Sequence, residues 1–129
     1  MHNTPCLALC IATVDRITEL DRLLTSLERQ DYVDFHVYLS DQNAPGTLDA
    51  VLQKHEDLQV TRILLPSQGV SIARNAILSL IGDEDIVVFP DDDCWYAPDT
   101  LAQVVEAFQR HPEAGAVLGY WTPSPELPP

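Results

Sequence analysis

Residues 86–93 read Ile-Val-Val-Phe-Pro-Asp-Asp-Asp, an apolar run followed directly by three carboxylates. An apolar run of this length is typical of a strand buried in a sheet. Asp91, Asp92 and Asp93 cannot follow that strand into the core, because an unpaired buried carboxylate is very costly. We therefore expect them at the carboxyl end of the strand, where open α/β sheets bind their ligands.

The aspartate triplet is compatible with two interpretations. Adjacent carboxylates repel one another unless a cation lies among them, and hard oxygen ligands suit Mg²⁺ or Mn²⁺, often shared with substrate phosphates. A solvated acidic turn would have the same sequence. The remainder of the chain has to decide between a metal site and such a turn.

Strands and helices are predicted to alternate along the whole chain. Apolar runs predict strands at 7–12, 35–39, 60–65, 85–89 and 114–118. Helices are predicted between them, the first opening at Thr18 with its capping signal and a stripe of leucines at helical spacing. This alternation implies a three-layer α/β/α fold with a mainly parallel sheet. Right-handed crossovers then bring the carboxyl ends of the strands to one edge.

Composition excludes several kinds of partner. The chain has 129 residues and is 46% apolar, enough for one domain with a real core. Twenty acidic residues against seven basic ones give a formal charge of −13, which argues against binding nucleic acid or an anionic lipid surface. A phosphorylated ligand would therefore need a metal ion to help neutralise it.

The chain is expected to consist of one domain, residues 1–121, and a proline-rich tail, residues 122–129. Three cysteines without a CxxC pair favour neither disulfides nor structural zinc, and reduced conditions fit this usage. No signal peptide or membrane span is recognised. We expect a cytoplasmic protein, whose full-length form could be peripheral to the membrane.

Polar residues collect at the predicted sheet edge. Thr13 ends the first strand and Asp15 follows it, Asp41 ends the second, and Arg74 in the third helix can reach the same rim. Carboxylates can accept hydrogen bonds from a base or a ribose, and arginine with a divalent metal can hold a diphosphate. Neither of the glycine-rich phosphate-binding motifs is present, so metal coordination by carboxylates is the natural substitute.

Four stretches together resemble the nucleotide-sugar-binding part of a family 2 glycosyltransferase with the GT-A fold. They are residues 10–16 (CIATVDR), 39–43 (LSDQN), 69–75 (GVSIARN) and 88–98 (VFPDDDCWYAP). The last is similar to the family's D-x-D motif with a proline five residues on. The order and the spacing of the stretches agree with the family over roughly Pro5 to Trp121.

The resemblance implies a role for each site residue. Thr13, Asp15 and Asp41 would line the nucleoside pocket with Asp41 near the base, and Arg74 would lie beside the nucleotide. Asp91 and Asp92 would approach the ribose, and Asp93 would bind the Mn²⁺ or Mg²⁺ that bridges the diphosphate. The implied reaction is sugar transfer, with inversion, from a nucleoside-diphosphate sugar to a hydroxyl on a saccharide or lipid-linked acceptor.

The sequence departs from the family in two ways. Family members usually continue well beyond this point with the acceptor site and the general base, so the fold is expected to be truncated and no catalytic base is identified; Glu126 is the only carboxylate of the tail. Cys94 stands where another acidic or small polar residue is usual. A truncated sheet edge could also cause self-association.

Two other functions remain open at this point. One is a Mg²⁺-dependent phosphotransferase or phosphohydrolase, although such folds often place the key aspartates at the first strand, which here ends in Thr13. The other is a non-catalytic nucleotide-binding module that has kept the fold.

Overall fold

The structure is a computed structural model that describes residues 4–66, 69–82 and 84–119. Strands and helices alternate through these residues, as predicted. Their order is β1 (Leu7–Thr13), α1 (Ile17–Glu28), β2 (Phe35–Asp41), α2 (Asp49–Lys54), β3 (Val60–Leu64), α3 (Val70–Leu78), β4 (Ile86–Val88) and α4 (Thr100–Arg110). The predicted tail at 122–129, with Glu126, and the domain boundary at 121 lie outside the described residues.

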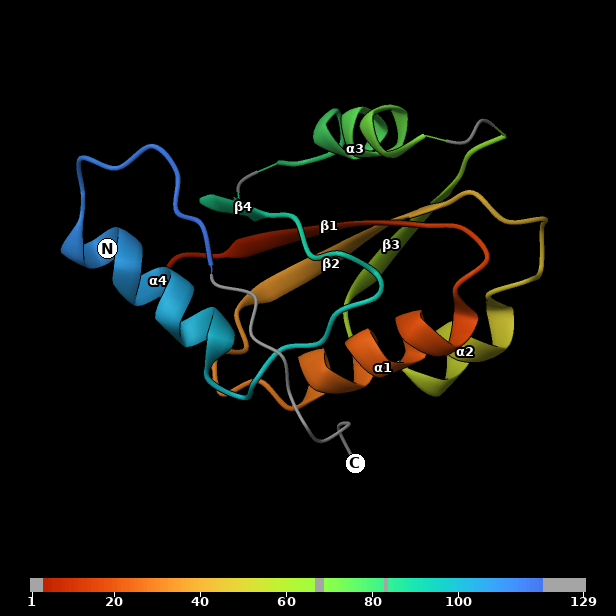
Figure 1. Cartoon of the computed structure of the whole chain (residues 1–129), viewed down its shortest axis with the longest axis horizontal. Helices are drawn as coiled ribbons and strands as arrows, with labels where there is room; N and C mark the ends of the chain where they lie inside the picture. Colours follow the sequence, from red (N-terminus) through yellow and green to blue (C-terminus); the bar gives the residue numbers. More distant parts are fainter. Residues whose placement is uncertain (1–3, 67–68, 83, 120–129) are drawn as a thin grey trace.

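The four strands form one parallel sheet in the order β3-β2-β1-β4 (Figure 1). Thr13 at the end of β1 is in register with Asp41 at the end of β2. β4 pairs only with the first half of β1, its last pair being Leu9 with Val88. The chain after Val88 therefore leaves the sheet alongside the second half of β1. This carries Asp91, Asp92 and Asp93 to the carboxyl edge, where Thr13 ends β1.

Helices cover both faces of the sheet, which confirms the predicted three-layer α/β/α fold (Figure 1). One face packs against α1, α2 and α4 and contains the larger core, with Leu9, Leu24 and Leu101 among its fully buried side chains. The other face packs against α3 through a smaller cluster that includes Cys10 and Ile77. Among the described residues, no helix is long and apolar enough to cross a membrane.

Two local predictions were wrong. Residues 114–118 form no strand, and Val117 and Leu118 are 39% and 95% exposed. Strand formation needs a neighbouring edge and a surface to pack on, and this segment has found neither within the described residues. The first helix begins at Ile17, one residue before Thr18, and no side chain caps its first turn.

A buried glutamine joins the end of α1 to the start of α4. Gln30 is 6% exposed, and its Nε2 donates to Ala97 O at 2.8 Å. Its Oε1 accepts the N–H of Leu101 at 3.0 Å. That N–H belongs to the first turn of α4, where it has no partner inside the helix. The glutamine therefore caps α4 from the loop that follows α1, since Asp99 makes no side-chain cap bond.

Gln30→Leu should lower the free energy of unfolding by about 2 kcal/mol, because it leaves the buried N–H of Leu101 unpaired. Urea unfolding followed by circular dichroism would measure this loss. Gln109→Leu makes the same change at an exposed position of α4 and should shift stability by less than about 0.5 kcal/mol. Equal effects of the two substitutions would show that Gln30 is not a cap.

Candidate functional site

A pocket of about 290 Å³ lies at the carboxyl edge of the sheet. Five of the predicted site residues line it: Thr13, Arg74, Asp91, Asp92 and Asp93. The other lining residues are Ala12, Val14, Arg16, Gln42 and Pro90. β1 contributes one wall, the turn after β4 a second, and α3 contributes Arg74. Residues that are far apart in the sequence therefore meet at one site, as the sheet topology predicted.

The aspartates occupy a tight turn after β4. Pro90 is buried at its start, and the N–H of Cys94 donates to Asp91 O at 3.2 Å. The side chains of Asp91 and Asp93 are 68% and 51% exposed. Arg74 lies 3.5 Å from Asp91 Oδ1 and stacks over the ring of Phe89 at 5.1 Å. The triplet is thus held at the mouth of the sheet and stays open to solvent on one side.

Arg16 is the main partner of the other two carboxylates. Its Nη1 lies 3.2 Å from Asp92 Oδ1 and 3.0 Å from Asp93 Oδ2. Asp92 and then Asp93 raise the pKa of this guanidinium. Burial raises the pKa of the Asp92 carboxyl, and the neighbouring Thr13 hydroxyl and then the charge of Arg16 oppose that shift. The sequence placed Arg16 just beyond the first strand, in the stretch 10–16, but no role in the site was assigned to it.

Asp41 is fully buried and does not line the pocket. Its Oδ1 accepts the backbone N–H of Asn43 at 3.0 Å and the side-chain amide of Asn43 at 2.9 Å. Its Oδ2 makes no hydrogen bond within the described residues, and the guanidinium of Arg62 lies 3.8 Å away. Oδ1 of this carboxylate therefore closes a turn, and Oδ2 faces the guanidinium of Arg62.

Asp15 also lies outside the pocket lining, on the exposed loop between β1 and α1. It adopts a positive φ of 57°, which is uncommon for a residue with a side chain. Its N–H donates to Asn43 Oδ1 at 2.8 Å. Asn43 thereby ties the loop before Arg16 to the end of β2. Sequence reasoning missed this role, although an Asp-x-Asn sequence after a strand is a known turn signal.

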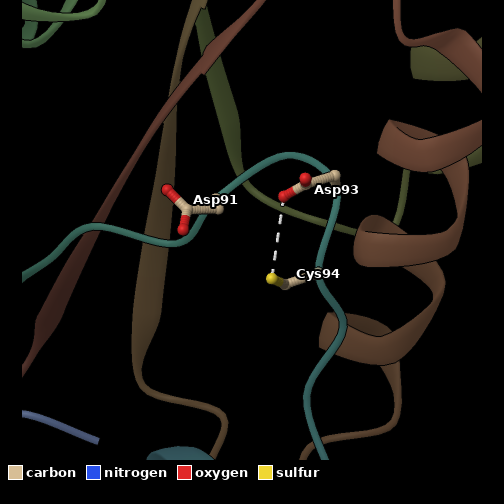
Figure 2. A group of neighbouring side chains, drawn as sticks. All are labelled: Asp91, Asp93 and Cys94. Carbon is tan, nitrogen blue, oxygen red and sulfur yellow. Dashed lines mark hydrogen bonds between the residues drawn. The ribbon is translucent and has the colours of Figure 1, made fainter. Parts of the chain in front are cut away.

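Asp91, Asp93 and Cys94 could together hold a metal ion, since one ligand atom of each lies within 4.8 Å of the others. Figure 2 shows them on the turn after β4, with Cys94 Sγ 3.7 Å from Asp93 Oδ1. The sequence predicted Asp93 alone as the ligand. Two carboxylates suit Mg²⁺ or Mn²⁺, while the thiol is a softer ligand. Burial raises the pKa of the Cys94 thiol, so the carboxylates are the ligands available at neutral pH.

A second observation indicates that the pocket accepts a ligand. The Thr13 hydroxyl lies beside Asp92, is buried, and makes no hydrogen bond of normal geometry within the described residues. Buried polar groups without partners are rare in native proteins. The residues present therefore fit a small polar ligand with a divalent cation.

A family model described as Glycosyl transferase family 2 matches residues 8–127. No curated protein sequence matches the chain significantly. The fold resembles that of TarS from S. aureus, solved as residues 1–349 with UDP, at a TM-score of 0.72 and 23% identity over 82% of this chain and 32% of that one. It also resembles the mannosyltransferase PcManGT from Pyrobaculum calidifontis, solved with GDP-Man and Mn²⁺.

For PcManGT the TM-score is 0.73 and the identity 26%, over 81% of this chain and 32% of that one. The chain therefore spans about a third of the length of these solved structures. PcManGT is a mannosyltransferase, and the similarity to both structures confirms the GT-A fold predicted for this chain, which covers only part of their length.

Proposed function

The chain belongs to glycosyl transferase family 2, and we propose that it is the donor-binding part of an enzyme that transfers a sugar from a nucleoside diphosphate. The observation that supports this most is the pocket in which Thr13, Arg74 and the three aspartates meet. A solvated acidic turn would need neither the buried hydroxyl of Thr13 nor the convergence with Arg74. TarS with UDP and PcManGT with GDP-Man are nucleotide complexes of the same fold.

The charge of the pocket explains why the donor would need a cation. Its lining has three carboxylates and two guanidinium groups, a balance of one negative charge. A diphosphate adds further negative charge at close range, which is unfavourable without compensation. Asp93, helped by Asp91, would hold Mn²⁺ or Mg²⁺ there. When bound, that ion stabilises the departing diphosphate as a Lewis acid.

The chain's own residues would bind and orient the donor. Arg74 would lie beside the nucleotide, with Asp92 and Asp91 toward the ribose. Asp41 would serve the base through Oδ2, its oxygen without a hydrogen bond in the described structure. Because Asp41 is fully buried, that contact requires a local opening on binding. Asp15 would form the outer wall of the nucleoside pocket.

We further propose that transfer proceeds with inversion to a hydroxyl on a saccharide or lipid-linked acceptor. Each aspartate of the pocket has a binding role, so another Asp or Glu would act as the general base. Because the chain spans about a third of the solved structures it resembles, we assign the acceptor site and this base to sequence outside it.

Calorimetric titration with UDP and GDP, each with and without Mn²⁺, tests the proposal. We expect one of the two nucleotides to bind, with an affinity that rises at least about tenfold when Mn²⁺ is present, because the cation neutralises repulsion worth about 1.4 kcal/mol or more. Binding of neither nucleotide in the presence of Mn²⁺ would contradict the proposal. Metal-dependent hydrolysis of a simple phosphomonoester would favour a phosphohydrolase instead.

A further inference from the structure

We propose that Arg16 is a built-in counter-ion for Asp92 and Asp93 in the free protein, and that it turns to the diphosphate of the donor when a divalent cation binds Asp93. The inference rests on the proposed function and assigns Arg16 two successive partners in the same pocket. It predicts that Arg16 opposes metal binding but favours nucleotide binding.

The guanidinium of Arg16 lies close to the carboxylate of Asp93, where a bound cation would repel it strongly. A single nitrogen, Nη1, contacts both Asp92 Oδ1 at 3.2 Å and Asp93 Oδ2 at 3.0 Å. The other oxygen of Asp93, Oδ1, faces the thiol of Cys94. A divalent cation held by Asp93 would share that carboxylate with a positively charged group, and the two positive charges would repel at short range. Arg16 and the metal therefore compete.

Arg16 is free to move once a cation has displaced it from the carboxylate of Asp93. Its side chain is 46% exposed, and its guanidinium makes no further hydrogen bond within the residues that the structure describes. An exposed ion pair of this kind is weak, typically about 0–1 kcal/mol. By contrast, Asp92 has a side chain only 12% exposed and cannot follow it.

The new partner of Arg16 would be a phosphate group. Arg16 lines the same pocket as Thr13 and Arg74, so its guanidinium is already within the donor site. A guanidinium binds phosphate through two parallel hydrogen bonds, which an ammonium group cannot reproduce. The Thr13 hydroxyl, buried and without a hydrogen bond of normal geometry in the described structure, points independently to a ligand in this pocket.

The loop geometry would keep Arg16 near both partners. The residue precedes α1 directly and follows Asp15, whose N–H is bound by Asn43. The backbone at this point is therefore tethered, and only the exposed side chain has to swing. A purely structural ion pair would behave differently, because its loss would not affect metal and nucleotide binding in opposite directions.

Two titrations of the intact chain with Arg16→Ala and Arg16→Lys test the inference. MnCl₂ alone should bind Arg16→Ala roughly two- to fivefold more tightly than the wild type, since two weak competing ion pairs are removed. UDP or GDP, whichever the wild type binds, should bind Arg16→Ala about tenfold more weakly at saturating Mn²⁺. Arg16→Lys should recover part of the metal competition but little of the nucleotide affinity.

Arg29→Ala is the matched control, because it removes the same charge from an exposed position at the other end of α1. It should change neither affinity appreciably. If the wild type binds Mn²⁺ and nucleotide but Arg16→Ala binds Mn²⁺ no more tightly, the inference is wrong and the proposed function stands. If neither protein binds Mn²⁺ or nucleotide, both fail. If Arg16→Ala binds Mn²⁺ and the wild type does not, the inference is supported.

Discussion

Asp93→Asn should weaken the Mn²⁺-dependent affinity for UDP or GDP by roughly 100-fold, because losing even an outer partner of a metal ligand costs about 10- to 100-fold. The substitution keeps the size of the side chain and removes its charge. Asp93 is more than half exposed, so the fold should not suffer. Titration with nucleotide at fixed Mn²⁺ measures the effect, and a thermal unfolding curve verifies that the variant is folded.

Two further substitutions separate the members of the acidic turn. Asp91→Asn should weaken the metal-dependent affinity by about tenfold, since Asp91 shares its carboxylate with Arg74 at 3.5 Å. Cys94→Ser should have a smaller effect, because its thiol is protonated at neutral pH. Asp57→Asn, an exposed aspartate after α2, is the matched control and should change nothing. A larger loss for Asp91 than for Asp93 would contradict the assignment of Asp93 as the principal ligand.

Much of the fold follows from local pattern. Apolar runs between turns predicted all four strands of the described residues, because the strand positions that pack against the helices need apolar side chains. The collection of polar residues at one edge followed from parallel topology alone. Thr13, Arg74 and the aspartates therefore meet as expected. Within that framework, a position at or just after the end of a strand placed Thr13 and the aspartates at the site, but it did not do so for Asp41.

Pairings between distant residues could not be predicted in this way. Gln30 acts on Ala97 and Leu101, and nothing near Gln30 in the sequence signals these partners. His55 was one of four scattered histidines, yet it is buried with its ring nitrogens 2.6 Å from Asp21 and 2.5 Å from Glu28. Each of these polar groups is tolerated inside because partners from another element satisfy it.

The direction in which a side chain points was the other feature that the sequence did not predict correctly. Asp41 ends β2 at the predicted edge, but the alternation along the strand turns it toward Arg62 and Asn43, outside the pocket lining. Segment 114–118 is apolar enough for a strand, but a strand also needs a partner edge. An apolar composition makes a strand possible, whereas the presence of a neighbouring strand with a free edge determines whether one forms.

Arg62→Met should lower the free energy of unfolding by about 2 kcal/mol, because it leaves the buried carboxylate of Asp41 without the cation that faces it. Asp41 is fully buried, and Arg62 is the cation at its second oxygen, Oδ2, 3.8 Å away. Arg62 also contacts Asp49 Oδ1 at 2.8 Å, but Asp49 is 65% exposed. Asp49→Asn should therefore cost less than about 0.5 kcal/mol, and it is the control within the same network.

The double variant Asp41→Asn with Arg62→Met distinguishes a charge effect from a packing effect. An asparagine at 41 keeps an oxygen for the two donors of Asn43 and carries no charge, so it removes the penalty that Arg62→Met creates. The double variant should then be more stable than Arg62→Met alone by about 1–2 kcal/mol, which urea unfolding can resolve. If Asp41→Asn lowers stability further, Asp41 does not need Arg62 as its counter-charge. Loss of packing by the arginine stem would then explain the effect of Arg62→Met. Recovery of stability would mean that β3 supplies the charge that compensates a buried carboxylate at the end of β2, beside Thr13 and the donor pocket.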